Sequence, residues 1–272
     1  MRENSYIIHG GSQGRERMRL VAEVLWPGTL AFLAHATPMA GKRVLDLGCG
    51  GGDVTLELAR FAGSDGCVLG LDFDPVKVAI AQDEATVAGL TNVRYCVGDA
   101  QSPDIFGILG APFDIVYARC FLSHLTEPDA VLRHIRDALA PNGQLLVEDV
   151  DFGNSFCTPK SWAFDLYVDL YQRAARRRGA DPEMGASLGQ RLASAGFKVA
   201  RRSWTQPTGC ERKIKLLSAL SLEAIAESVV VDGVVSSDIV SSAVDELYRL
   251  AEDSTTVMST PRIVQVSGTC QP

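Results

Sequence analysis

The stretch "VLDLGCGGGDVTLELA", residues 44–59, holds four glycines within five positions. An apolar run precedes these glycines, and a run with helical spacing follows them. Each glycine costs about 0.5–1 kcal/mol more than alanine would when the backbone is fixed. The loop must therefore need unusual backbone angles or a close approach of another group to the main chain. Because a helix N-terminus offers unpaired N–H donors, a glycine loop at this point favours a site for an anionic group.

Strand-like and helix-like runs alternate on both sides of this loop. The strand-like runs are residues 44–47, 67–74, 93–100, 113–120 and 144–152, and the helical runs are residues 53–62, 76–90 and 128–143. Strands that alternate with helices of this length indicate crossover connections. The pattern predicts an α/β fold with a doubly wound, mostly parallel sheet and helices on both faces. Ligands of such sheets bind beyond the carboxyl ends of the strands.

The later part of the chain is mainly helical. Helical runs cover residues 161–178, 185–196 and 212–253, and strand-like runs cover residues 198–204 and 262–269. Most of these helices cannot extend the alternation, so we expect them to cap the ligand end of the sheet. We divide the single predicted domain into an N-terminal helical lid segment (residues 1–35), a cofactor-binding core (36–152) and the remaining strands with helical substrate-lid insertions (153–272).

Composition excludes several classes of protein. The chain has 272 residues, 46% of them hydrophobic, and a formal net charge of -7, which disfavours nucleic acid as a partner. No apolar run approaches the roughly 20 residues of a membrane span, and the N-terminus lacks the pattern of a signal peptide. Seven cysteines occur without a CxxC pair, so we expect free, mostly buried thiols. These features predict a soluble, cytoplasmic protein that binds neither nucleic acid nor membranes.

An acidic residue completes the nucleotide pattern. Asp72 lies about 20 residues beyond the glycine loop, at the end of the second strand-like run, where a ribose-binding carboxylate belongs. A dinucleotide fingerprint needs a further glycine at position 53, where this chain has Asp53. The loop therefore argues against NAD.

Five segments resemble, in order, the motifs of Rossmann-like (class I) S-adenosylmethionine-dependent methyltransferases. They are "VLDLGCGGG" (44–52), "GLDFDP" (70–75), "GDA" (98–100), "FDIVYARCFLSHL" (113–125) and "ALAPNGQLLVEDVDF" (138–152). The resemblance implies a seven-stranded sheet whose last strand is antiparallel. It also implies S-adenosyl-L-methionine as cofactor and S-adenosyl-L-homocysteine as its product.

The resemblance also assigns residues to the cofactor. Asp72 would bind both ribose hydroxyls, Phe73 would lie beside the adenine, and Asp99 would accept from its amino group. The run "YIIHGGSQGRERMRL" (6–20) resembles the lid segment of small-molecule methyltransferases of secondary metabolism, in which a tyrosine and an arginine approach the methionine end of the cofactor. The complete predicted set is Tyr6, Arg17, Asp46, Gly48, Gly50, Asp72, Phe73, Asp99, Ala100 and Arg119.

The chemistry expected is transfer of a methyl group by in-line displacement. Positioning of the two reactants supplies much of the catalysis, and a base is needed only when the acceptor must lose a proton. His124 follows the fourth strand-like run and is the leading base candidate, with Asp149 as a second catalytic candidate. We predict no metal. The predicted substrate residues are Glu148, Asp151, Phe152, Phe156, Trp162 and Tyr167.

The predicted function is methylation of an O, N or C atom of a small, apolar or aromatic metabolite, as in tailoring of natural products. Arsenite methylation is an alternative if the thiols of Cys120, Cys157 and Cys210 converge. A cofactor-binding homologue without methyl transfer, such as a cyclase, is another. RNA methylation is disfavoured, because "ARCF" stands where base-amino methyltransferases carry an NPPY-type motif. A homodimer stays open, since the helical lid could pair between chains.

Overall fold

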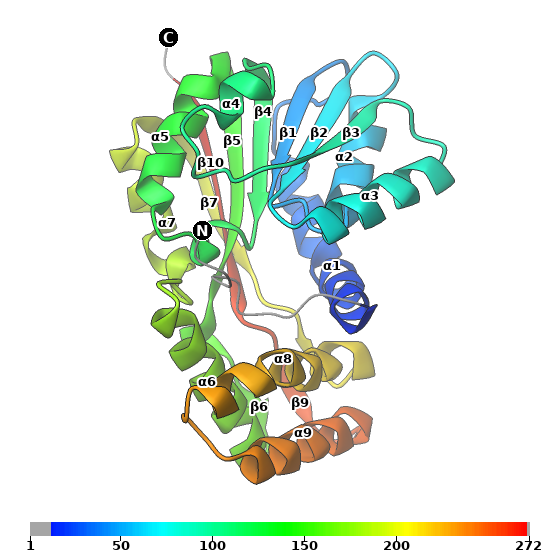
Figure 1. Cartoon of the computed structure of the whole chain (residues 1–272), viewed down its shortest axis with the longest axis vertical. Coiled ribbons are helices and arrows are strands. Elements are labelled where there is room, and N and C mark those ends of the chain that lie inside the picture. Colours follow the sequence, from blue (N-terminus) through cyan, green and yellow to red (C-terminus); the bar gives the residue numbers. More distant parts are fainter. Residues whose placement is uncertain (1–11, 271–272) are drawn as a thin grey trace.

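The computed structural model describes residues 12–270 and has a seven-stranded sheet at its centre (Figure 1). The strands follow the order β3-β2-β1-β4-β5-β10-β7. The five strands β3 to β5 in this order pair in parallel, whereas β10 is antiparallel to both of its neighbours. Their bounds are β1 Arg43–Leu47, β2 Cys67–Asp72, β3 Val93–Val97, β4 Phe113–Arg119, β5 Leu139–Asp151, β7 Phe197–Thr205 and β10 Arg262–Cys270. The predicted fold class is confirmed.

Helices cover both faces of the sheet because the central strands are apolar on both sides. Val44 and Leu45 of β1 are fully buried, and they belong to the cores on opposite faces. One face carries the end of α1 (Ser12–Leu33), α2 (Asp53–Ala62) and α3 (Pro75–Val87). The other face carries α4 (Ile105–Ile108), α5 (Pro128–Ala138) and α7 (Met184–Ser194) (Figure 1).

Local sequence sets the helix boundaries. Asp74 caps α3, since its side chain accepts the backbone N–H groups of Val76 and Lys77, and Pro75 occupies the first helical position. The helix predicted over residues 128–143 is shorter in the structure, where α5 ends at Ala138 and β5 begins at the next residue. Pro141 cannot donate a helical hydrogen bond, and the chain instead enters the sheet through a register shift opposite Phe113.

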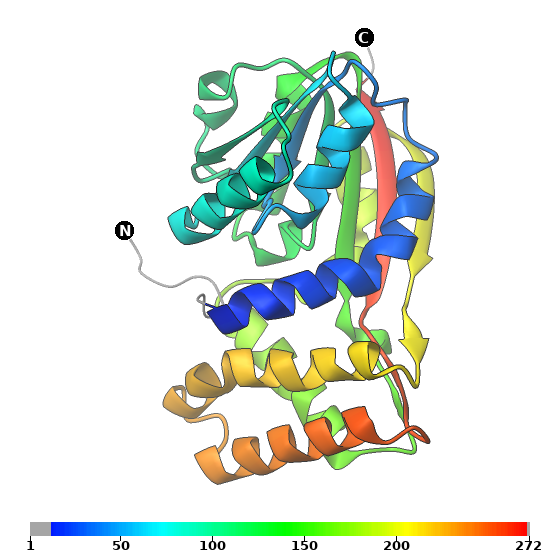
Figure 2. The ribbon, with the colours of Figure 1, turned by 90° about the vertical axis from the view of Figure 1, so that its right-hand side faces the viewer.

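A second layer lies beyond the carboxyl ends of the parallel strands. It contains α6 (Trp162–Arg177), α8 (Arg212–Val231), α9 (Ser237–Glu252) and a small sheet of β6 (Cys157–Thr158), β9 (Val257–Ser259) and β8 (Thr208–Gly209). The three helices share a core of their own, in which Phe164, Leu222 and Leu247 are buried. Figures 1 and 2 show this lid layer below the sheet, with α1 running between the two.

Charged contacts fix α1 to helices of the core on one side and to the lid on the other. Arg15 of α1 is 7% exposed, and its guanidinium donates to Asp53 of α2 at 2.9 Å and to Glu84 of α3 at 3.0 Å. On the other side, Lys213 of α8 donates to Glu23 of α1 at 2.9 Å. A single helix therefore joins the two layers.

Substitution of Arg15 by methionine should lower the free energy of unfolding by about 3 kcal/mol, because it leaves the Asp53 carboxylate without its arginine and Glu84 with Arg19 alone. Urea denaturation measures this loss. Arg60→Met is the matched control, since Arg60 pairs with Glu57 at an exposed site and should change stability by less than about 1 kcal/mol. Equal effects of the two substitutions would show that Arg15 does not act as a buried clamp.

Among residues 12–270, no helix combines the length and the apolar character that crossing a bilayer would need. The cytoplasmic location stays a prediction.

Candidate functional site

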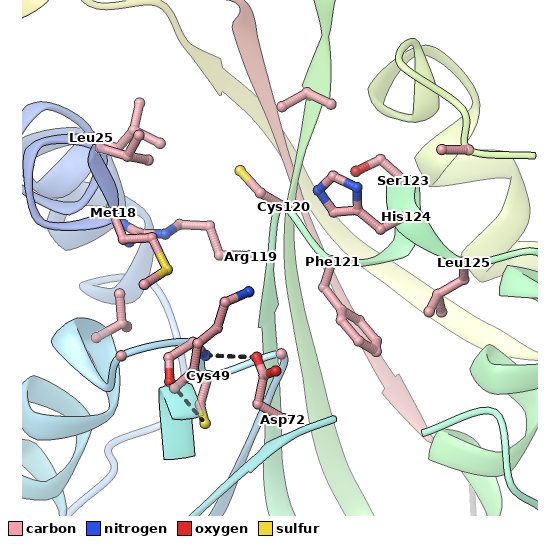
Figure 3. A pocket seen from close by; sticks show the side chains of 18 of the residues that line it. Met18, Leu25, Cys49, Asp72, Arg119, Cys120, Phe121, Ser123, His124 and Leu125 are labelled. Atoms are coloured by element: carbon pink, nitrogen blue, oxygen red, sulfur yellow. Dashed lines mark hydrogen bonds between the residues drawn. The ribbon is translucent and has the colours of Figure 1, made fainter. Parts of the chain in front are cut away.

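A cavity of about 720 Å³ opens where the parallel strands end, and residues of α1, α6 and α8 contribute to its lining (Figure 3). Figure 3 shows Met18 and Leu25 of α1 on one side and His124 and Leu125 on the other. We call the part nearer the sheet the core half, lined by Asp46, Gly48, Gly50, Asp72, Phe73 and Asp99. The lid half is lined by Arg17, Leu25, Phe152, Tyr167, Tyr171 and Ser221, among others.

The glycine loop forms the floor of the core half. Gly48 has φ +69°, and a Cβ built there would lie 2.5 Å from the Phe121 ring, so no other residue fits. Gly50 has φ +55°, and a Cβ there would meet no other group closer than the Met18 sulfur at 3.6 Å. The main chain at Gly50 therefore faces open cavity, which answers why the loop is rich in glycine.

Asp72 organises this loop. Its carboxylate is 7% exposed and accepts the backbone N–H of Gly50 at 2.9 Å and of Asp74 at 3.0 Å. Phe73 follows it at the rim of the cavity and is 53% exposed. Asp99 lies on the neighbouring strand end, where its carboxylate accepts the Gln101 N–H at 2.9 Å. An acid, an exposed ring and a second acid thus line one side of the core half.

The cavity lining also includes a third acid, Asp46, and an arginine, Arg119. Asp46 is buried and accepts from the Thr55 hydroxyl at 2.6 Å. Burial raises the pKa of Asp46 to about 7, although the Thr55 hydrogen bond and the charge of Arg119 oppose this shift. Arg119 lines the cavity and donates to Thr29 of α1 at 3.3 Å.

These groups match the parts of a nucleoside that carries an amino acid. A carboxylate suits ribose hydroxyls, a ring suits adenine, and a carboxylate beside a guanidinium suits an ammonium and a carboxylate. Gly50 lines the same cavity and has no side chain to fill it. The residues present therefore fit S-adenosylmethionine.

The family model described as a methyltransferase domain matches residues 38–175, half of the chain. The chain belongs to this methyltransferase family.

Relatives and solved structures agree with this family. The aklanonic acid methyltransferase DauC of Streptomyces sp. (strain C5) is 34% identical over 127 residues, which cover 47% of this chain and 56% of DauC. The ubiquinone/menaquinone biosynthesis C-methyltransferase UbiE of Vibrio vulnificus (strain YJ016) is 33% identical over 147 residues, or 53% of each chain. The chain thus spans about half the length of the curated relatives it matches.

The similarity of fold extends over the whole chain. The [4+2]-cyclase SpnF aligns with 97% of this chain and 98% of its own chain, at 22% identity and a TM-score of 0.57. Solved methyltransferases that depend on S-adenosylmethionine share the fold as well. The predictions of a Rossmann-like methyltransferase fold and of S-adenosylmethionine as the cofactor are confirmed.

His124 lies where the sequence of this chain predicts a base. It ends the short helix Leu122–His124 after β4 and lines the cavity between the two halves. Burial, with the nearby charges of Arg17 and Lys77, lowers the pKa of His124 to about 4. The imidazole is therefore neutral at neutral pH and can accept a proton.

The acidic run at the end of β5 does not reach the cavity, contrary to prediction. Glu148 is fully buried and accepts from Tyr117 of β4 at 2.6 Å and from Gln265 of β10 at 2.7 Å. Asp149 is fully buried on the other face, accepts the Ser123 N–H at 3.1 Å, and has a pKa that burial raises to about 6. Hydrogen bonds from other elements satisfy both buried carboxylates, so Glu148 does not face the cavity, and Asp149 holds the loop that carries His124.

The other predicted substrate residues divide into two groups. Phe152 and Tyr167 line the lid half, in a cluster where the Phe152 ring stacks on Tyr171 with centroids 4.2 Å apart. Asp151 instead accepts from Asn154 at 2.8 Å outside the cavity lining. Phe156 and Trp162 are also outside that lining and are 43% and 54% exposed. The spacing of residues in the sequence predicts that these three lie near the lid, but it does not predict whether their side chains face the cavity.

The cysteines do not form the thiolate site that arsenite would need. Cys120 lines the cavity, but Cys157 is buried in β6 and Cys210 is exposed, and neither belongs to the cavity lining. Cys120 has a left-handed φ of 49°, a strained conformation of a kind that often occurs at functional sites. The alternative based on three converging thiols is therefore wrong for this geometry.

Sequence reasoning missed some contributors to the cavity. Ser221 of α8 lines the lid half, where its hydroxyl oxygen accepts from Nε of Arg17, 204 positions away in the chain. Thr29 connects Arg119 to Glu148, since it accepts from the former at 3.3 Å and donates to the latter at 3.2 Å. No local pattern marks either residue. Tyr6 lies outside the described residues.

Proposed function

We propose that this chain transfers a methyl group from S-adenosylmethionine to a small, largely apolar metabolite. One observation carries the proposal: a single cavity joins a nucleoside-type core half to an aromatic lid half. Such a cavity suits two ligands held side by side, which is what direct transfer between them needs. The N-terminal segment, residues 1–35, and the helices after residue 152 are proposed to enclose the acceptor.

The cofactor supplies an activated methyl group on a sulfonium. For its binding, Asp72 holds the ribose hydroxyls, Phe73 covers the adenine, and Asp99 with Ala100 borders the adenine edge. Asp46 and Arg119 bind the ammonium and carboxylate groups at the other end. The loop at Gly48 and Gly50 lets the ligand rest against the main chain.

His124 is the proposed base for an acceptor that must lose a proton. It lies at the boundary of the two halves, where the acceptor atom would meet the methyl group. Its pKa of about 4 makes it a weak base, so it suits a proton that leaves as the bond to the methyl group forms, because the acceptor atom then becomes much more acidic. Asp149 acts indirectly by fixing Ser123.

The purified chain should produce S-adenosylhomocysteine when S-adenosylmethionine and a panel of phenols, enols, amines and carboxylic acids are supplied. Calorimetry with S-adenosylhomocysteine tests the cofactor site separately. Conversion of a panel member without release of S-adenosylhomocysteine would favour a cyclase-like activity instead. Absence of binding would reject the proposal entirely.

The affinity for S-adenosylhomocysteine should rise about tenfold between pH 6 and pH 8. The pKa of Asp46 is about 7, so at lower pH this carboxyl group must lose a proton before it can bind an ammonium. The sign for stability is opposite: a raised pKa stabilises the free protein at low pH, and this contribution is lost as pH rises through about 7. Calorimetry and urea denaturation across this range measure both effects. Asp46→Asn should abolish both, and a pH-independent affinity of the wild type would contradict the role.

Replacement of His124 by asparagine should lower kcat for a proton-bearing acceptor by at least a hundredfold, the usual contribution of a general base. It should leave the affinity for S-adenosylhomocysteine unchanged. His35→Asn serves as control because His35 is exposed at the far end of α1. An unchanged kcat at saturating acceptor would exclude His124 as the base.

A further inference from the structure

The lid half contains a single charged side chain among its described lining residues. That residue is Arg17 of α1. The four carboxylates that line the cavity, Asp46, Asp53, Asp72 and Asp99, all belong to the core half. The lid half therefore carries a positive charge that the acids of the cavity do not face at close range.

Arg17 is held in place by one hydrogen bond. Its Nε donates to the hydroxyl of Ser221 on α8 at 3.1 Å, and Ser221 is 4% exposed. Within residues 12–270, Arg17 has no ion pair, and its two Nη groups have no hydrogen-bond partner. The planar end of the guanidinium is therefore available to a ligand.

A second hydroxyl lies beside this charge. Tyr167 of α6 is 4% exposed and lines the same half of the cavity. Burial raises the pKa of Tyr167 to about 12, although Arg17 and Ser221 act against this shift. The phenol therefore keeps its proton near neutral pH and can donate a hydrogen bond.

The walls around these polar groups are apolar. Leu25, Phe152, Leu217 and Ile263 line the lid half from four different parts of the chain. A partly buried guanidinium among apolar side chains is costly unless an anion accompanies it. Two parallel N–H donors match the two oxygens of a carboxylate.

We propose that the acceptor is an organic carboxylate. Its anionic group lies on the Nη groups of Arg17 with the Tyr167 and Ser221 hydroxyls nearby, and its apolar body lies against the walls of the lid half. This inference rests on the proposed function in assigning the core half to the cofactor. It moves Arg17 from the predicted cofactor set to the acceptor, and it leaves Arg119, beside Asp46, for the cofactor.

The test uses the full chain saturated with S-adenosylhomocysteine and the pair 2-naphthoate and methyl 2-naphthoate, which differ in the anionic charge. Calorimetry should show that the carboxylate binds at least tenfold more tightly than the ester. Arg17→Met should reduce this ratio to about one, and Ser221→Ala should reduce it by a smaller factor. Arg19→Met is the matched control, since Arg19 lies on the same helix with a 62% exposed side chain and should leave the ratio unchanged.

Three results would overturn the inference. The carboxylate and the ester could bind equally to the wild type. No member of the series benzoate, 2-naphthoate and anthracene-2-carboxylate could bind at all. Arg17→Met could weaken binding of S-adenosylhomocysteine instead of changing the ratio, which would return Arg17 to the cofactor. Failure of the proposed function would appear differently, as absence of S-adenosylhomocysteine binding to the wild type. In that case the ratio of the affinities for 2-naphthoate and its methyl ester can be measured in the absence of S-adenosylhomocysteine.

Discussion

Replacement of Asp72 by alanine should weaken binding of S-adenosylhomocysteine by at least a hundredfold. The carboxylate accepts two backbone N–H groups, from Gly50 at 2.9 Å and Asp74 at 3.0 Å, and its remaining capacity faces the cavity. Loss of hydrogen bonds to a charged group costs about 1.5–3 kcal/mol each. Two such losses at the ligand, together with a loosened loop, reach the stated factor, since about 1.4 kcal/mol corresponds to tenfold.

Calorimetry on folded protein measures this change. Asp83→Ala is the matched control, because Asp83 is an exposed acid on α3, close to the same site in sequence. The control separates the specific contact from the overall loss of one negative charge. Affinities within threefold of the wild type for Asp72→Ala would mean that the ribose is bound elsewhere.

Replacement of Glu148 by alanine should lower the free energy of unfolding by about 3–5 kcal/mol. The fully buried carboxylate accepts hydrogen bonds from Tyr117 at 2.6 Å, from Gln265 at 2.7 Å and from Thr29 at 3.2 Å. These donors come from β4, β10 and α1. Loss of their common acceptor leaves buried donor groups without a hydrogen bond in all three elements. A loss of this size is a large part of the stability of an ordinary domain.

Urea denaturation and cofactor affinity together separate the possible roles of Glu148. Glu148→Gln keeps the shape and should lose less stability than the alanine variant, whereas Glu16→Ala removes an exposed acid and should have little effect. Because Thr29 also contacts Arg119, we expect a secondary loss of affinity for S-adenosylhomocysteine. Unchanged stability with a raised KM for the acceptor would restore the substrate role that the sequence predicts.

The sequence predicts the core half of the site well because its signals are local. The glycine loop, Asp72 and Asp99 each follow a strand within a few residues, and parallel strands bring their carboxyl ends to one edge. The helices of the lid could also be placed along the chain from their spacing. The residues that face the cavity from these helices could not, since their direction depends on packing between α1, α6 and α8.

The error at β5 has a physical reason. Strands buried on both faces lose the alternation of polar and apolar residues that reveals direction. Glu148 and Asp149 therefore look equally suited to a ligand, but each is satisfied by donors from distant elements, such as Gln265 for the former and Ser123 for the latter. Val150 and Phe152, just beyond them, are the residues that reach the cavity.

The position of α1 has a kinetic consequence. This helix lines both halves of the cavity. Arg15 binds it to the core, and Glu23 binds it to the lid. Ligands bound in either half lie against the same helix. Movement of α1 should therefore affect the residence times of both ligands. Weakening the contacts of Arg15 or of Glu23 should then shorten the residence times of both the nucleoside and the metabolite, even though neither residue need contact a ligand.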